Sequence, residues 1–138
     1  MKKAISIAAL FLLLTVCLNV TAAAAPPTEI QPMWENTSLV TGTMVFNGPD
    51  GTTGMTEMRV IGKVGVTRIE GTVTIYQVVG DTLIFIKNDG NTVNTRSCYI
   101  ETAFPAEHGG EYRADFRFVV YKAGVGEVIE RTITKTCP

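Results

Sequence analysis

Hydrophobic and polar residues alternate along most of the chain beyond residue 36. In the clearest run, Arg68–Ile75, every second residue is apolar or glycine and the intervening residues are charged or threonine. The run Tyr112–Tyr121 repeats this pattern, with aromatic and aliphatic residues on one side and Arg or Asp on the other. A period of two is typical of a β-strand that has one face in a core and one in water. Both runs are therefore predicted to be half-buried strands.

Five further segments complete a set of seven predicted strands. Segments 38–46 and 56–64 each place three apolar residues on one face, namely Val40, Met44 and Phe46 in the first and Met58, Val60 and Val64 in the second. The segment 83–86 is apolar on both faces, which predicts a central strand. The last two predicted strands span 93–104 and 128–137.

Clusters of Gly, Asn and Asp separate these segments and favour tight turns. They occupy residues 47–51, 80–81, 88–91, 108–110 and 123–126. Strands joined by such turns predict an all-β fold over residues 36–138, an antiparallel immunoglobulin-like β-sandwich of about seven strands. A small closed β-barrel is the alternative.

The first 24 residues have the layout of a secretory signal peptide. Lys2 and Lys3 precede an apolar run over 4–18, and small residues follow over 20–25. We expect cleavage after Ala22 or Ala24, then an extended, proline-containing leader over 25–35. The run is too short for a membrane span, and no second hydrophobic segment is long enough to anchor the processed protein. The processed protein is therefore expected to be secreted, either extracellular or associated with the cell envelope.

Cleavage leaves two cysteines, Cys98 and Cys137, in a compartment where disulfides persist. We predict that they form an intramolecular disulfide, with two free thiols or an intermolecular link as the alternatives. The formal charge of −1 provides no basic surface for nucleic acid.

Residues suited to catalysis are few. His108, the single histidine, stands beside Glu107 as a general base or metal ligand would, but the Gly-rich context favours a solvated loop residue. Asn88, Asp89 and Asn91 could offer oxygen ligands to a hard cation, but their spacing fits a hairpin turn better. We therefore expect a non-enzymatic protein with no metal and no cofactor.

Three aromatic residues are the candidate binding residues. Trp34 precedes the first strand and either contacts a ligand or caps the core, the latter being favoured. Tyr76 and Tyr121 point away from the expected core and could form an adhesive face or stabilise the sheet alone. The leading hypothesis is a binding module for an unknown macromolecule or glycan. The alternative is a structural or assembly subunit of a cell-envelope or pilus-like structure, in which edge strands pair between chains.

Three segments carry a resemblance to a known group, namely residues 30–37, 62–76 and 132–138. In them the chain resembles small secreted β-sandwich proteins of Gram-positive, Clostridia-type bacteria. The resemblance implies an exported β-sandwich and assigns no catalytic or binding residue.

Overall fold

The computed structural model describes residues 33–48 and 51–138. The expected signal peptide and the leader up to residue 32 lie outside the described residues. The strands are β1 (Thr37–Asn47), β2 (Thr53–Gly62), β3 (Val66–Val79), β4 (Thr82–Val93), β5 (Ser97–Pro105), β6 (Glu111–Lys122) and β7 (Val125–Thr136). Within the described part of the chain, no helix has the length and apolar character needed to cross a membrane.

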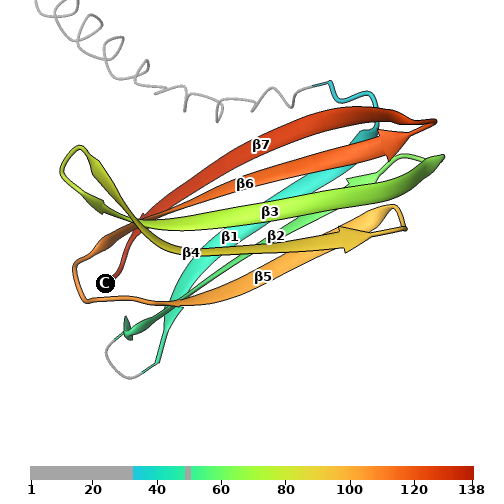
Figure 1. Ribbon diagram of the computed structural model, residues 1–138. Helices are drawn as coiled ribbons and strands as arrows, with labels where there is room; N and C mark the ends of the chain where they lie inside the picture. The colour runs from blue at the N-terminus through green and yellow to red at the C-terminus, as the bar shows by residue number, and fades with distance from the viewer. Residues whose placement is uncertain (1–32, 49–50) are drawn as a thin grey trace, which may run out of the picture. The chain divides into compact units, whose positions relative to one another are not determined.

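The strands form two antiparallel sheets, as Figure 1 shows. One sheet has the order β1-β2-β5 and the other has the order β4-β3-β6-β7. The predicted β-sandwich is therefore confirmed, and the two sheets do not close into a barrel. The order follows the immunoglobulin arrangement of seven strands, except that the fourth strand pairs with the third instead of the fifth.

The core fills the space between the sheets with the apolar faces that the alternation predicted. Every second residue is buried from Ile69 to Ile75 in β3 and from Tyr112 to Val120 in β6, including the aromatic side chains of Tyr112, Phe116 and Phe118. Gly71 in β3 lets the layers approach, because a Cβ atom there would lie 2.5 Å from the ring of Phe118 and 2.7 Å from Ile100. The inward faces of β3 and β6 are therefore as the sequence predicted.

The connections confirm four of the five predicted turns and correct the fifth. Residues 88–91 lie inside β4, and the chain turns between β4 and β5 over 94–96 instead. The polar residues of this segment are tolerated in a strand because β4 has a sheet neighbour on one side only. The second strand also ends earlier than expected, at Gly62, so that Val64, predicted to face the core, lies in a turn and is 79% exposed.

The predicted central position of segment 83–86 is also wrong. This segment opens β4, which lies at the edge of the four-stranded sheet. Its side chains are largely exposed because the hairpin that contains them extends to the end of the sandwich (Figure 1). Segment 83–86 is therefore part of an exposed edge strand, although it is apolar on both faces.

The predicted disulfide between Cys98 and Cys137 is wrong: both cysteines are free and buried. Cys98 pairs with Val60 near one end of β2, whereas the Cys137 thiol donates to the carbonyl of Gly51, just before the other end, at 3.0 Å. The strand rise of about 3.3 Å per residue separates these ends by more than about 20 Å. A disulfide needs Cα atoms about 4.4–6.8 Å apart, so the thiols cannot reach each other.

Candidate binding surfaces

Trp34 packs against the core, as the favoured interpretation expected. It is half-buried, and the guanidinium carbon of Arg131 lies 5.1 Å from its ring centroid in a cation–π contact. The ammonium group of Lys63 donates to the Trp34 carbonyl. Two cationic side chains thus hold this residue against the sandwich, which leaves only part of its ring available to a ligand.

Tyr121 lies on the outer face of the four-stranded sheet. The guanidinium carbon of Arg68 is 5.6 Å from its ring centroid, and its hydroxyl donates to Glu70 at 3.3 Å. These contacts are cross-strand pairs of the kind that stabilise a sheet without a ligand.

Tyr76 lies on the same outer face but far from Tyr121. It pairs with Arg113, whereas Tyr121 pairs with Arg68, eight positions away along β3. At about 3.3 Å per residue, the two tyrosines are separated by roughly 26 Å. They therefore do not form one adhesive face, and Tyr76 belongs to a different cluster.

That cluster is the apolar hairpin, which we define as residues 76–86 of β3, β4 and their connecting turn. The Tyr76 and Phe85 rings meet edge to face, with centroids 6.4 Å apart. Phe85 is 61% exposed, and three further apolar side chains of the hairpin are exposed, namely Val79 (51%), Leu83 (41%) and Ile84 (47%). Leu83 and Phe85 lie on the same face of the hairpin as Tyr76, and Val79 and Ile84 lie on the other face. Clustered exposed apolar side chains are typical of interaction surfaces.

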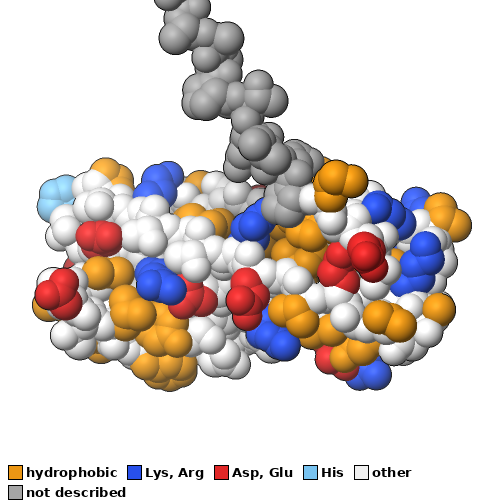
Figure 2. Space-filling view, turned by 90° about the horizontal axis from the view of Figure 1, so that it is seen from above, with side chains coloured by type: hydrophobic (Ala, Val, Ile, Leu, Met, Phe, Trp, Pro, Cys, Tyr) orange, Lys and Arg blue, Asp and Glu red, His pale blue; other side chains and the backbone are white. Residues whose placement is uncertain are grey.

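Figure 2 shows the distribution of side-chain types over one face of the molecule. Lys and Arg side chains are interspersed there with Asp and Glu, and no area of a single charge is visible. Hydrophobic side chains gather at the lower left, toward the end at which the β3–β4 turn lies in Figure 1. The surface thus favours an apolar contact over long-range electrostatic attraction.

Side chains of the second half of β4 tie this strand to β5 of the opposite sheet. Lys87 donates to the Ala103 carbonyl at 3.3 Å, and Asn91 donates to the Tyr99 carbonyl at 2.9 Å. Between them the Asp89 carboxylate accepts from the buried Thr102 hydroxyl at 2.6 Å. We call these three bonds the β4–β5 seam, and they begin only at Lys87.

The Asp89 carboxylate is the central acceptor of this seam. The hydroxyl of Thr102, together with the Gly90 amide, which donates to Asp89 at 2.8 Å, lowers the pKa of Asp89. Donors to a carboxylate favour its charged form. Asp89 is therefore a structural anion that links β4 to β5.

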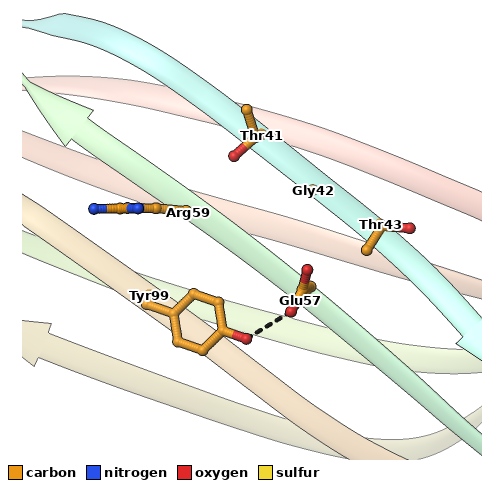
Figure 3. Close-up of a pocket in the computed structure, with 6 residues that line it drawn as sticks. All are labelled: Thr41, Gly42, Thr43, Glu57, Arg59 and Tyr99. Carbon is orange, nitrogen blue, oxygen red and sulfur yellow. Dashed lines mark hydrogen bonds between the residues drawn. The ribbon is translucent and has the colours of Figure 1, made fainter.

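A second candidate surface is a shallow polar hollow of about 390 Å³ on the outer face of the three-stranded sheet. Its lining residues, drawn in Figure 3, are Thr41, Gly42, Thr43, Glu57, Arg59 and Tyr99. The Tyr99 hydroxyl lies 2.6 Å from a Glu57 oxygen and 2.7 Å from a Glu101 oxygen. The phenol has one proton, which it donates to either carboxylate, and hydrogen bonding to Glu57 first and then to Glu101 raises the pKa of Tyr99. The hollow thus combines an exposed ring with fixed hydrogen-bonding groups.

His108 lies in the turn between β5 and β6. It is exposed, and its Nδ1 contacts the carbonyl of Pro138. The neighbouring Glu107 amide donates to the hydroxyl of buried Tyr112 at 2.7 Å, which fixes the turn. Within residues 33–48 and 51–138, no group of three or more His, Cys, Asp or Glu side chains is placed to hold a metal ion.

Comparisons with known proteins add little to this geometry. No family model matches the chain, and no curated protein matches it. Among solved structures, it is similar to a protein from Archaeoglobus fulgidus with a TM-score of 0.34 and 12% sequence identity, over 72% of this chain and 96% of that one. None of this bears on the resemblance to secreted proteins of Gram-positive bacteria, which stays a prediction.

The apolar hairpin and the Tyr99 hollow were not identified from the sequence. The hairpin did carry a signal, because an apolar segment that follows a two-residue turn and precedes Lys87 and three further polar or Gly residues fits an edge strand. The hydrogen bond of Tyr99 to Glu57 depends on the register of β2 with β5, which places Tyr99 opposite Arg59 and Glu101 opposite Glu57. Nothing in the local pattern of either strand specifies that register.

Proposed function

We propose that this protein is an exported, non-catalytic binding module whose binding surface is the apolar hairpin. The observation that carries this proposal is the exposure of Val79, Leu83, Ile84 and Phe85 on one edge hairpin. Each of these side chains would bury most of its area against a partner, at about 25 cal/mol per Å² of apolar surface removed from water. The N-terminal pattern of the chain supports export.

The hairpin suits a polypeptide partner better than a sugar. Its exposed side chains are aliphatic and aromatic, and the edge of β4 can extend the sheet by one strand of a partner. Such pairing supplies affinity through main-chain hydrogen bonds and specificity through the alternating side chains. Tyr76, one of the three candidate residues from the sequence, contributes its ring to this surface through Phe85.

A photo-reactive amino acid at position 85 tests this function in cells that produce the protein. We expect illumination to yield a cross-linked polypeptide of defined mass, identified by mass spectrometry. The matched control places the same amino acid at position 121, on the outer face of the same sheet and away from the hairpin. Equal cross-linking from both positions, or none from position 85, would refute the proposal.

A second candidate function is glycan binding at the Tyr99 hollow. An exposed aromatic ring beside Glu57, Arg59 and two threonines offers both a stacking surface and hydrogen-bonding groups. We expect Tyr99→Ala to abolish binding on an oligosaccharide array, while Tyr121→Ala leaves it unchanged. Binding that survives Tyr99→Ala, or no binding by the parent protein, removes this candidate.

A further inference from the structure

The three turns at one end of the sandwich carry only positive charges. These turns connect β2 to β3, β4 to β5 and β6 to β7, and they lie at the end where β1 begins (Figure 1). Counted with two flanking residues on each side, they contain Lys63, Arg96 and Lys122 and no Asp or Glu. We call residues 63–65, 94–96 and 122–125 the cationic end.

The connections at the opposite end carry the opposite sign. Counted in the same way, the β3–β4 and β5–β6 connections contain Asp81, Glu107 and Glu111 and no Lys or Arg. The charges of the connections are thus polarised along the strands, although the formal net charge of the chain is only −1. Such an asymmetry orients a protein in the field of a charged surface.

Two exposed valines lie among these cations. Val64, in the β2–β3 turn, is 79% exposed, and Val125, at the start of β7, is 67% exposed. Their turns lie side by side, because Lys122 pairs with Val66 on one side and with Val125 on the other. A Cβ atom on Gly65 would lie 3.1 Å from Cε of Lys122, so the stem of this lysine lies against the β2–β3 turn.

The cations of this end are available to a ligand. Among the described residues, neither Arg96 nor Lys122 forms an ion pair with a carboxylate. Two acids, Glu35 and Glu127, lie behind the turns, where the Glu127 carboxylate accepts from the backbone or side chains of residues 35–37 at 2.5–3.1 Å. Glu127 is therefore engaged with the start of β1 and does not pair with the cations of the turns.

The shape of the cationic end favours a bilayer over a folded protein as its partner. A stable protein–protein interface buries about 800 Å² on each partner, which two narrow turns with one exposed valine each do not supply. A bilayer needs no complementary shape. Its interface accepts apolar side chains singly, and its anionic headgroups attract Lys and Arg side chains within about one Debye length.

We propose that the cationic end docks on the surface of an anionic phospholipid bilayer. Val64 and Val125 enter the interfacial region, and Arg96 and Lys122 contact the headgroups. This inference goes beyond the proposed function and uses a different surface. The ten residues of β3 from Val66 to Tyr76 span about 33 Å, so a docked molecule presents the apolar hairpin away from the bilayer.

Vesicle flotation of the purified protein tests the docking. We expect the parent protein to float with vesicles of equal parts phosphatidylglycerol and phosphatidylcholine, and far less with phosphatidylcholine alone. Val64→Asp and Val125→Asp should each weaken this binding more than tenfold. The matched control, Val79→Asp, changes an exposed valine at the opposite end and should float as the parent does. No flotation of the parent, or equal flotation with both kinds of vesicle, overturns the proposal.

Charge variants separate insertion from simple attraction to a polyanion. Each Lys or Arg near an anionic surface strengthens binding about fivefold, so Arg96→Gln and Lys122→Gln should each weaken binding by this factor. Arg117→Gln, in the middle of the outer face of β6, is the control and should bind as the parent does. If these two variants weaken binding while Val64→Asp does not, the cationic end binds polyanions without inserting, and the proposal is overturned.

A fluorophore reports the position of the tip without depending on a charged substitution. An environment-sensitive dye attached to Val64→Cys should shift to shorter wavelength on the anionic vesicles, whereas the same dye on Val79→Cys should not. A shift from Val79→Cys alone would place the apolar hairpin on the bilayer and overturn both this proposal and the proposed function. If neither dye shifts, the docking proposal alone is overturned, because cross-linking from position 85 does not depend on it.

Discussion

The hydrogen bond between Asp89 and Thr102 can be removed by replacing either residue, and replacing Asp89 should lower the free energy of unfolding more than replacing Thr102. Thr102 is buried, whereas the Asp89 side chain is 44% exposed and also accepts from Gly90. Asp89→Ala therefore leaves a buried hydroxyl without its acceptor, which costs about 1–3 kcal/mol. Thr102→Val removes the hydroxyl itself and leaves Asp89 to water, so this substitution should cost less than about 1 kcal/mol.

The contribution of Asp89 should also depend on pH. Because its pKa is lowered in the folded protein, its stabilisation is complete above the unfolded pKa of about 3.9 and is lost as the pH falls through the lower folded value. Urea unfolding at pH 7 and at decreasing pH below 4 measures both effects. We expect the free energies of unfolding of the parent protein and Asp89→Ala to converge in acid. Equal costs for the two substitutions, or a difference that does not change with pH, would refute this reasoning.

Three further predictions concern other residues. Tyr112→Phe should lower the free energy of unfolding by about 1 kcal/mol by removing the acceptor of the Glu107 amide, whereas Tyr121→Phe should change it by less than about half of that in the same urea titration. Alkylation under native conditions should leave Cys98 and Cys137 unmodified, and alkylation in denaturant should modify both; a disulfide-linked peptide would contradict the structure. The phenol of Tyr99 should ionise above the usual pH in an absorbance titration, and Glu57→Gln should lower its pKa.

The sequence predicts those parts of the fold in which burial alone determines the pattern. β3 and β6 have neighbours on both sides, with one face in the core, so their alternation gives the correct inward residues, from Ile69 to Ile75 and from Tyr112 to Val120. Trp34 was likewise expected to pack against the core. These features depend on local sequence and on the requirement that apolar faces be covered.

The features that the sequence missed depend on which strands are neighbours. At the sheet edge, neither the apolar residues 83–86 nor the polar residues 88–91 are constrained by burial, so the first were assigned to a central strand and the second to a turn. The predicted disulfide failed for a similar reason. An even number of cysteines does not indicate where each one lies in the fold. The direction of β5 places Cys98 beside Val60, near the end of β2 that is far from Cys137.

Amide hydrogen exchange along β4 tests most directly whether its open edge is the binding surface. The two-residue turn at Gly80 and Asp81 makes Val79 and Thr82 a hydrogen-bonded pair, so the amides of Thr82 and Ile84 bond to β3 and those of Leu83 and Phe85 point away from the sheet. The amides of Thr82 and Ile84 should be protected with or without a bound partner. The amides of Leu83 and Phe85 should exchange rapidly in the protein alone and become protected when the polypeptide that cross-links to position 85 is bound. Rapid exchange of Leu83 and Phe85 that partner binding leaves unchanged, or protection of both already in the protein alone, would contradict this account.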